Sequence, residues 1–169
     1  MTIRPATVAD LTAINDIYNY FVVHATCTYQ LDPSSEQERM AWFNYHGPRY
    51  PVTVAVDPAS DEVVGWGSLS PFHPRAAYRF TVEDSVYVHH AQHRRGIGKA
   101  LMCDLIGRAL DLGYHNIIGI ISADQTGSVA LHRSAGFREV GVLKGVGYKF
   151  DRWLDVLYMQ WTRPGHPHS

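Results

Sequence analysis

A glycine-containing turn flanked by basic residues is the first feature of this sequence that can bind a ligand. Gly96 and Gly98 lie directly before a segment with helical periodicity, and Arg94, Arg95 and Lys99 surround them. Free backbone N–H groups at the start of a helix, together with the helix dipole, attract phosphate and pyrophosphate groups. The pattern indicates an anion site. A plain turn before a solvated basic helix end is the alternative, because an isolated glycine pair is a weak motif.

Two adjacent carboxylates precede this turn, on a segment with the two-residue alternation of a β-strand. Strict alternation places Glu83 and Ser85 on one face of the strand and Asp84 on the other. A carboxylate beside a phosphate-binding site can act as a general base, accepting a proton from an attacking nucleophile. The alternative is an exposed or salt-bridged carboxylate without a catalytic role.

A second, shorter helical segment is predicted over about 126–134 and carries Ser128 and His132. A serine near the start of a helix can bind part of a cofactor. An imidazole with an ordinary pKa of about 6.5 can donate a proton near neutral pH. For His132 the alternative is a hydrogen-bonded histidine at the surface of the helix.

Histidines and cysteines are distributed in a way that argues against a metal site. His89, His90 and His93 form the densest group of the ten histidines, without Cys or carboxylate ligands at zinc spacing. Cys27 and Cys103 have no CxxC spacing, so they predict neither a zinc site nor a disulfide framework. We expect no metal, and we expect both cysteines to pack as small apolar residues.

The spacing of apolar residues predicts the elements that hold these groups. A strand, a long helix and a buried strand, over about 78–88, 97–109 and 116–121, form a right-handed βαβ unit with parallel strands. Four isoleucines between 117 and 121 are typical of a strand buried on both faces. Trp42, Phe43, Trp66 and Phe72 are expected in the core, with Phe72 beside His73 as a possible pocket wall. Further helices are predicted over 7–21, 35–43 and 126–134, and further strands over 2–5, 52–56, 63–69 and, as a pair, 139–161.

Composition excludes several classes of protein. The chain has 169 residues, of which 46% are hydrophobic and 18% charged, which is typical of a globular protein. Its formal net charge of -1 lacks the basic excess of general nucleic-acid-binding domains, and no apolar run is long enough to span a membrane. We therefore predict one α/β domain over 1–163 with a flexible tail over 164–169, in a cytoplasmic protein that binds neither nucleic acid nor membrane.

Taken together, these motifs resemble the GCN5-related N-acetyltransferase (GNAT) superfamily over essentially the whole chain, and more narrowly its phosphinothricin N-acetyltransferase group. The resemblance rests on Ile17-Tyr18-Asn19, on Thr81-Val82-Glu83 with Ser85-Val86-Tyr87-Val88, on Leu131-His132 with Gly136-Phe137, and on Gly147-Tyr148-Lys149-Phe150 with Arg152-Trp153. It implies an acyl-CoA N-acyltransferase fold, in which a central mixed, mostly antiparallel sheet is flanked by helices.

The resemblance also implies acetyl-CoA as co-substrate, inserted where one strand splays from its parallel neighbour. Two positions depart from the family pattern, because His93 stands in place of the usual Gln or Arg and Gln125 in place of an Asn. The backbone of the strand would bind pantetheine and the thioester carbonyl, and the turn would bind pyrophosphate. The implied cofactor-binding residues are Val86, Tyr87, Val88, Arg94, Arg95, Gly96, Ile97, Gly98, Lys99, Gln125 and Ser128.

For the chemistry, the resemblance implies Glu83 as general base toward the acceptor amine, directly or through a water. Val88 N–H would bind the developing oxyanion, and His132 would protonate the CoA thiolate. Arg75, with Arg79 as a second candidate, would pair with a carboxylate or phosphinate of the acceptor. The implied acceptor-binding residues are His73, Pro74, Arg75, Glu83, Asp84 and Ser85.

Three functions follow from this reading. The first is an N-acetyltransferase for phosphinothricin, methionine sulfone, methionine sulfoximine or a related amino acid, acting by direct attack in a ternary complex. The second acetylates a peptide N-terminus or lysine and needs an open acceptor groove. The third is a non-catalytic acyl-CoA sensor. Relatives of this kind are often homodimers that meet through their C-terminal strands, so we expect a homodimer.

Overall fold

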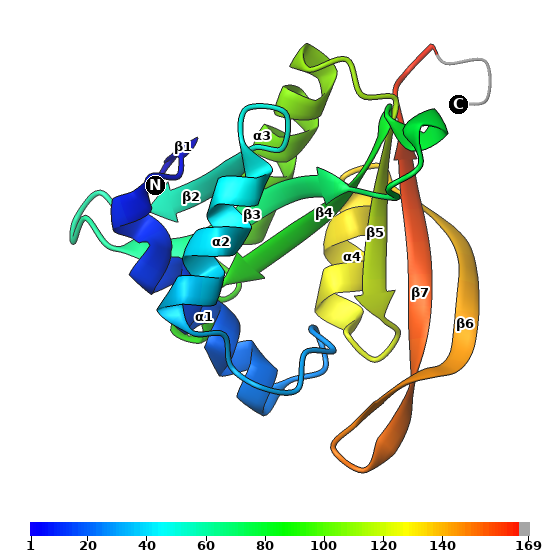
Figure 1. Ribbon diagram of the computed structural model, residues 1–169, viewed down its shortest axis with the longest axis horizontal. Helices are drawn as coiled ribbons and strands as arrows, with labels where there is room; N and C mark the ends of the chain where they lie inside the picture. The colour runs from blue at the N-terminus through cyan, green and yellow to red at the C-terminus, as the bar shows by residue number, and fades with distance from the viewer. Residues whose placement is uncertain (166–169) are drawn as a thin grey trace.

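The computed structural model describes residues 1–165, in which seven strands form one sheet in the order β1-β2-β3-β4-β5-β7-β6 (Figure 1). The strands are β1 (Thr2–Pro5), β2 (Val52–Val56), β3 (Val63–Pro71), β4 (Thr81–Val88), β5 (Asn116–Ser122), β6 (Arg138–Lys149) and β7 (Arg152–Thr162). The helices are α1 (Leu11–His24), α2 (Glu36–His46), α3 (Ile97–Asp111) and α4 (Thr126–Ser134). Of the predicted tail, only Pro164 and Gly165 lie within the described residues.

The mixed, mostly antiparallel sheet confirms the predicted fold class. Of the strand pairings among the described residues, β4 with β5 is parallel and the others are antiparallel. Helix α3 connects these two parallel strands, as the βαβ pattern predicts. Within residues 1–165 no helix has the length and apolar character needed to cross a membrane.

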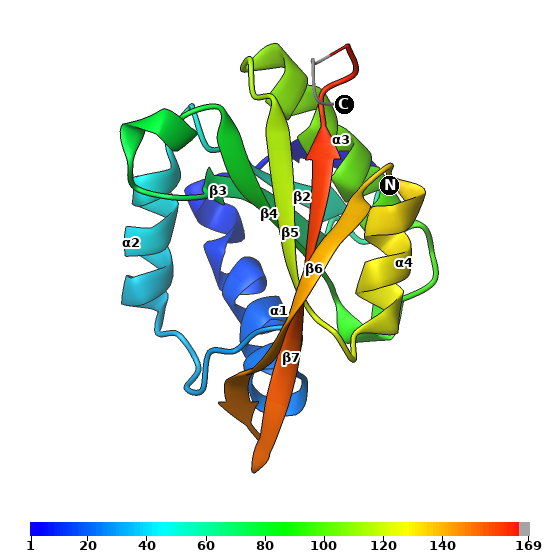
Figure 2. The ribbon, with the colours of Figure 1, turned by 90° about the vertical axis from the view of Figure 1, so that its right-hand side faces the viewer.

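Helices cover both faces of the sheet, with α1 and α2 on one face and α3 and α4 on the other (Figure 2). On the first face Ile14 and Ile17 of α1 pack with Trp66 of β3. On the second, Met102 and Leu105 of α3 pack among buried sheet residues. Helices α1 and α3 each bury the apolar stripe that their 3.6-residue periodicity creates. This burial stabilises the fold by roughly 25 cal/mol per Å² of apolar surface removed from water.

Four local predictions need correction. Cys103, expected to pack as an apolar residue, is exposed. Phe72 is only partly buried, outside the core clusters, and does not line the cavity described below. The strand predicted from residue 78 begins at Thr81, because Ala76–Tyr78 form a short 3-10 helix in which Tyr78 N–H bonds to Arg75 O. The prediction that 116–121 is buried on both faces also fails at Ile120, which is 38% exposed. Ile120 instead borders the cavity described below.

Strands β4 and β5 separate along their length (Figure 1). Strand β4 pairs with β3 from Val82 to Val88, but it pairs with β5 only over Thr81–Glu83. His89 N–H donates to Val64 O at 2.9 Å. Because ladder bonds alternate along an antiparallel strand, the N–H and C=O of Val88 face the other way, toward the space between β4 and β5.

The β6–β7 hairpin extends beyond the body of the molecule (Figure 1). Its turn residues Phe150 and Asp151 both have positive φ, 52° and 55°, as a tight hairpin turn requires. Gly147 lies against the ring of Tyr29, and a Cβ there would be 2.3 Å from a ring carbon. Large apolar side chains remain exposed on the hairpin: Val140, Val142, Leu143, Val146, Tyr148, Phe150 and Trp153.

Candidate active site

A cavity of about 1120 Å³ lies where β4 and β5 separate, and it collects most of the residues that the sequence predicts for the site. It extends from the start of α3 to the aromatic side chains of α1, α2 and β3. Lining residues that were predicted are Glu83, Asp84, Ser85, Val86, Tyr87, Val88, Arg94, Gly96, Ile97, Gly98, Lys99, Gln125, Ser128 and His132. The predicted residues His73, Pro74, Arg75 and Arg95 do not line it.

One end of the cavity is the N-terminus of α3, where the glycine turn presents backbone amides. Gly96 is the N-cap with φ +78°, and no side chain caps the helix. Arg94 also has a positive φ, 62°, which is strained for a residue with a Cβ. Arg95 turns away, because its guanidinium bonds to Gln92 and lies 3.8 Å from the Asp57 carboxylate. Arg94 and Lys99 therefore remain to add positive charge to this anion site.

Glu83 is half-buried in the wall of the cavity on β4. Burial and, second, the negative charge of Asp84 raise the pKa of Glu83 to about 7. A carboxyl group with this pKa is partly ionised at neutral pH and can both accept and release a proton.

Asp84 and His132 form a buried pair on the opposite face of β4. His132 Nε2 lies 3.0 Å from Asp84 Oδ2, and Nδ1 lies 2.8 Å from Ser128 O. Burial lowers the pKa of His132, but the hydrogen bond and charge of Asp84 outweigh it, so the pKa is raised. The pair fits only because residue 119 is glycine, since a Cβ there would be 2.7 Å from the His132 ring.

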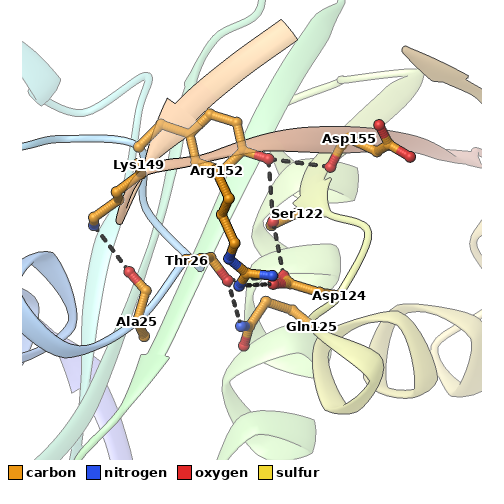
Figure 3. Close-up of polar contacts among 9 residues, drawn as sticks. Ala25, Thr26, Ser122, Asp124, Gln125, Lys149, Arg152 and Asp155 are labelled. Carbon is orange, nitrogen blue, oxygen red and sulfur yellow. Dashed lines mark hydrogen bonds and ion pairs between the residues drawn. The ribbon is translucent and has the colours of Figure 1, made fainter. Parts of the chain in front are cut away.

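The loop between α1 and α2 forms a further wall and is fixed by a polar network (Figure 3). Thr26 bonds to Asp124 at 2.7 Å, and Gln125 donates to Thr26 at 2.8 Å. Tyr29 donates to Ser122 at 3.1 Å. Arg152 bonds to Asp124, and Lys149 donates to the backbone oxygens of Ala25 and Thr28. The network joins the hairpin and the start of α4 to this loop. It also binds the side-chain amide of Gln125 to Thr26 of the protein itself.

This geometry, a splayed parallel strand pair beside an uncapped helix N-terminus, agrees with the comparison to known proteins. Residues 14–137 match the Acetyltransferase (GNAT) family. The chain belongs to this family. It is therefore an enzyme of the N-acetyltransferase class.

Several known acetyltransferases resemble nearly the whole chain. An L-methionine sulfoximine/L-methionine sulfone acetyltransferase from Pseudomonas aeruginosa is 41% identical over 160 residues, which are 94% of this chain and 92% of that protein. The crystal structure of a phosphinothricin acetyltransferase from Sinorhizobium meliloti in complex with AcCoA has a TM-score of 0.92 at 41% identity, covering 95% of this chain and 87% of that one. A ribosomal-protein-alanine N-acetyltransferase from Brucella melitensis has a TM-score of 0.93 at 40% identity, covering 96% and 100%.

The far end of this GNAT cavity contains residues that sequence reasoning missed. Tyr18, Arg39 and Gln30 line it, as do Trp42 and Trp66, which were expected only as core residues. They come from α1, the following loop, α2 and β3. Because they are far apart in the sequence, they form no contiguous motif that could have been recognised. The available signal was Arg39, a cation directly before the apolar run Met40-Ala41-Trp42-Phe43 of a predicted helix.

The histidine group considered as a metal site has other contacts. His90 stacks on Tyr20 with ring centroids 3.8 Å apart, and His93 stacks on Phe21 at 6.1 Å. His93 Nε2 also lies 3.1 Å from Val88 O. Residues 1–165 contain no group of three His, Cys, Asp or Glu side chains arranged to hold a metal ion.

Proposed function

We propose that this protein transfers the acetyl group of acetyl-CoA to the α-amino group of a small amino-acid-like acceptor of the phosphinothricin or methionine sulfone/sulfoximine type. One observation carries the proposal: a single cavity joins the anion site at α3 to a half-buried carboxyl group with a pKa of about 7. The relatives from P. aeruginosa and S. meliloti, named for such acceptors, support the substrate class.

The residues present fit acetyl-CoA. The uncapped turn at Gly96–Lys99 offers N–H groups and positive charge to a pyrophosphate, with Arg94 beside it. The backbone of Val86–Val88 borders the separation of β4 and β5, where an extended pantetheine chain can accept and donate strand-like hydrogen bonds. When bound there, acetyl-CoA supplies the activated acyl group as a thioester.

Glu83 is our proposed general base. The acceptor arrives as an ammonium ion, and its nitrogen gains a lone pair only after a proton has left. The Glu83 carboxylate takes this proton, directly or through a water, because its raised pKa brings its basicity closer to that of the amine.

The oxyanion and the leaving group require two further groups. The N–H of Val88 faces the separation between β4 and β5, and we propose that it bonds to the carbonyl oxygen as negative charge develops. We assign protonation of the departing thiolate to His132, whose raised pKa favours the protonated ring. To donate, this ring must release its bond to Asp84 or to Ser128.

Direct attack in a ternary complex is the proposed order of events. Cys27 lines the cavity, but burial raises the pKa of its thiol to about 11, which disfavours the thiolate that an acyl carrier needs. Initial velocities at varied acetyl-CoA and acceptor should give intersecting double-reciprocal lines. Parallel lines would indicate an acyl-enzyme and overturn this order.

Free-thiol release from acetyl-CoA tests the function. We expect saturable turnover with phosphinothricin, methionine sulfone or methionine sulfoximine, and none with a lysine-containing peptide. The second candidate is acetylation of a peptide N-terminus, which the likeness to the ribosomal-protein-alanine N-acetyltransferase favours. Turnover of an alanine-terminated peptide alone would replace the first function by the second. CoA binding without turnover of any acceptor would support an acyl-CoA sensor.

We also propose a homodimer and a cytoplasmic location. The exposed apolar side chains of the β6–β7 hairpin support the dimer, with Trp153 70% exposed. Sedimentation should give twice the chain mass for the wild type and the chain mass for Val142→Asp; a wild-type monomer would contradict the dimer. Both cysteines are free thiols, as is usual in the cytoplasm, and fractionation of the source cells tests the location.

A further inference from the structure

Arg39 is a buried cation that the proposed mechanism does not yet use. Its side chain is on α2, only 4% of its surface is exposed, and it lines the cavity that also contains Glu83. Burial lowers the pKa of this guanidinium, because charge is costly to remove from water. A residue of this type is rarely buried unless a partner stabilises its charge.

The protein groups around Arg39 are neutral. Its Nε donates to Asn15 Oδ1 at 3.1 Å, and Asn15 is held in turn by Ser34 O at 2.9 Å. The guanidinium carbon lies 4.6 Å from the ring centroid of Tyr18, 4.8 Å from that of Trp42 and 5.8 Å from that of Trp66. These contacts fix the plane of the side chain, but aromatic faces and one amide oxygen supply no full negative charge.

The carboxylates that line the cavity in the described part of the chain, Glu38, Glu83 and Asp84, form no ion pair with Arg39. Glu38 accepts hydrogen bonds from the N–H and hydroxyl of Ser35, at 2.7 and 2.8 Å, where it completes the N-terminal cap of α2. The pKa of Glu83 responds to burial and to Asp84. Among residues 1–165, the ion pairs of the structure leave Arg39 out. The terminal nitrogens of its guanidinium thus have no bond to a carboxylate of the described chain.

We propose that Arg39 binds the α-carboxylate of the acceptor, so that the amino acid is held between this cation and Glu83. The proposal rests on the proposed function and deepens it. A zwitterionic amino acid carries one charge for each end of this part of the cavity, its carboxylate for Arg39 and its ammonium for Glu83. A planar guanidinium can bind a carboxylate through two parallel hydrogen bonds, which also fixes the direction of the amine.

Arg75, the residue that the sequence indicates for this task, is in a different position. It is exposed in the turn before Ala76–Tyr78, and its side chain does not line the cavity. An exposed arginine also binds an anion less strongly, because water and salt screen its charge. Arg39 is the buried guanidinium that the cavity itself presents.

The test uses steady-state kinetics of the full chain with methionine sulfone and with its carboxamide, which lacks the carboxylate. Arg39→Met should raise KM for methionine sulfone by about tenfold to a hundredfold, the usual effect of losing hydrogen bonds to a charged group. Its KM for acetyl-CoA, and its kcat/KM for the carboxamide, should change less than about threefold relative to wild type, since neither involves the carboxylate. The KM of Arg39→Lys for methionine sulfone should fall between those of the wild type and Arg39→Met. Lysine keeps the positive charge but lacks the planar guanidinium that donates two parallel hydrogen bonds.

Arg49→Met is the matched control, because Arg49 is exposed in the turn after α2 and outside the cavity. Its KM values should equal those of the wild type. Trp42 and Trp66 lie beside Arg39, so quenching of tryptophan fluorescence gives acceptor affinity without turnover. If Arg39→Met does not fold, the steady-state kinetics and the fluorescence titration are both made with Arg39→Lys instead.

The outcomes separate this inference from the proposed function. A wild-type enzyme that turns over methionine sulfone, together with an Arg39→Met variant of unchanged KM, overturns the inference alone. Equal losses for the acid and the carboxamide also overturn it, since they indicate a structural role. A wild type inactive on both acceptors overturns the proposed function and this inference with it.

Discussion

The two ends of the cavity are built in different ways. The end at α3 comes from one continuous stretch, Val86–Lys99, in which a strand, a turn and a helix N-terminus follow one another. The other end combines Tyr18 of α1, Arg39 of α2 and Trp66 of β3, which meet only after the chain has folded. A site made of neighbours in sequence presents backbone groups in a readable motif. A site made of distant side chains depends on the register of the whole fold.

Glu83 lines the same cavity, and its substitution should have the largest effect. Glu83→Gln removes the proposed base but keeps size and hydrogen bonding, so kcat should fall by about 10²–10⁴-fold while KM for acetyl-CoA stays near wild type. Glu62→Gln, in the exposed turn before β3, is the control and should be fully active. Wild-type turnover by Glu83→Gln across the pH range would remove Glu83 as base.

The pH profile should show the same group titrating. Because the pKa of Glu83 is raised to about 7 and its ionised form is the active one, kcat/KM should rise with pH up to about 7. It should fall again at higher pH, where His132, the proposed acid, loses its proton. Below a pH of about 7 the rate should fall about tenfold per pH unit. Asp84→Asn removes the second cause of the raised pKa, so the acidic limb should move to lower pH. An unmoved limb would show that Asp84 does not act on Glu83.

Gly96→Ala tests the α3 end alone. Its φ of +78° disfavours a Cβ, so the turn should distort and KM for acetyl-CoA should rise about threefold to tenfold, with KM for the acceptor unchanged. Gly107→Ala is the control in the same helix, where a Cβ meets no atom within 4 Å. It should stabilise the protein by about 0.5–1 kcal/mol in thermal denaturation. If Gly96→Ala raised KM equally for acetyl-CoA and for the acceptor, the two ends of the cavity would not be independent.

Lys149→Met tests the other end, with the smallest expected effect. The substitution removes the hydrogen bonds from Nζ to Ala25 O and Thr28 O, which hold the loop wall. Acceptor KM should rise about twofold to fivefold, and unfolding free energy should fall by about 1–3 kcal/mol, because buried carbonyls lose their donor. Lys144→Met, which removes an exposed ion pair with Asp155, should change neither quantity. An acceptor KM that stays at the wild-type value in Lys149→Met would contradict the role of this lysine.

Local patterns predicted the fold well because each element has its own period. The helical stripe of α3 and the isoleucine-rich β5 were recognisable in isolation, and the structure confirms both elements and their parallel arrangement. The predictions for Tyr78 and Ile120 were wrong because the periodicity of their own segments does not reveal the surrounding structure. A short 3-10 helix interrupts the alternation before β4, and the separation of β4 from β5 uncovers one face at Ile120.

The part of the candidate site that lies in one continuous segment was predictable, and the part built from distant side chains was not. The predicted cofactor-binding residues between Val86 and Lys99 line the cavity except Arg95, whose partners Asp57 and Gln92 could not be foreseen from spacing. Arg39 was not predicted as a site residue because a charged residue in a helix ordinarily faces solvent. Only the packing of α2 against Tyr18 and Trp66 reveals that this one faces inward.

The separation of β4 from β5 also bears on aggregation. An unpaired strand edge is a template for addition of another chain, and most proteins guard such edges at their periphery with charge, bulges or covering loops. Here the open edge lies at the centre of the sheet, with α3 and α4 on one side and α1 on the other. Helices on both faces of the sheet hinder strand addition by a neighbouring molecule at this edge. The backbone edge that we propose for pantetheine is thereby shielded from strand addition by other proteins.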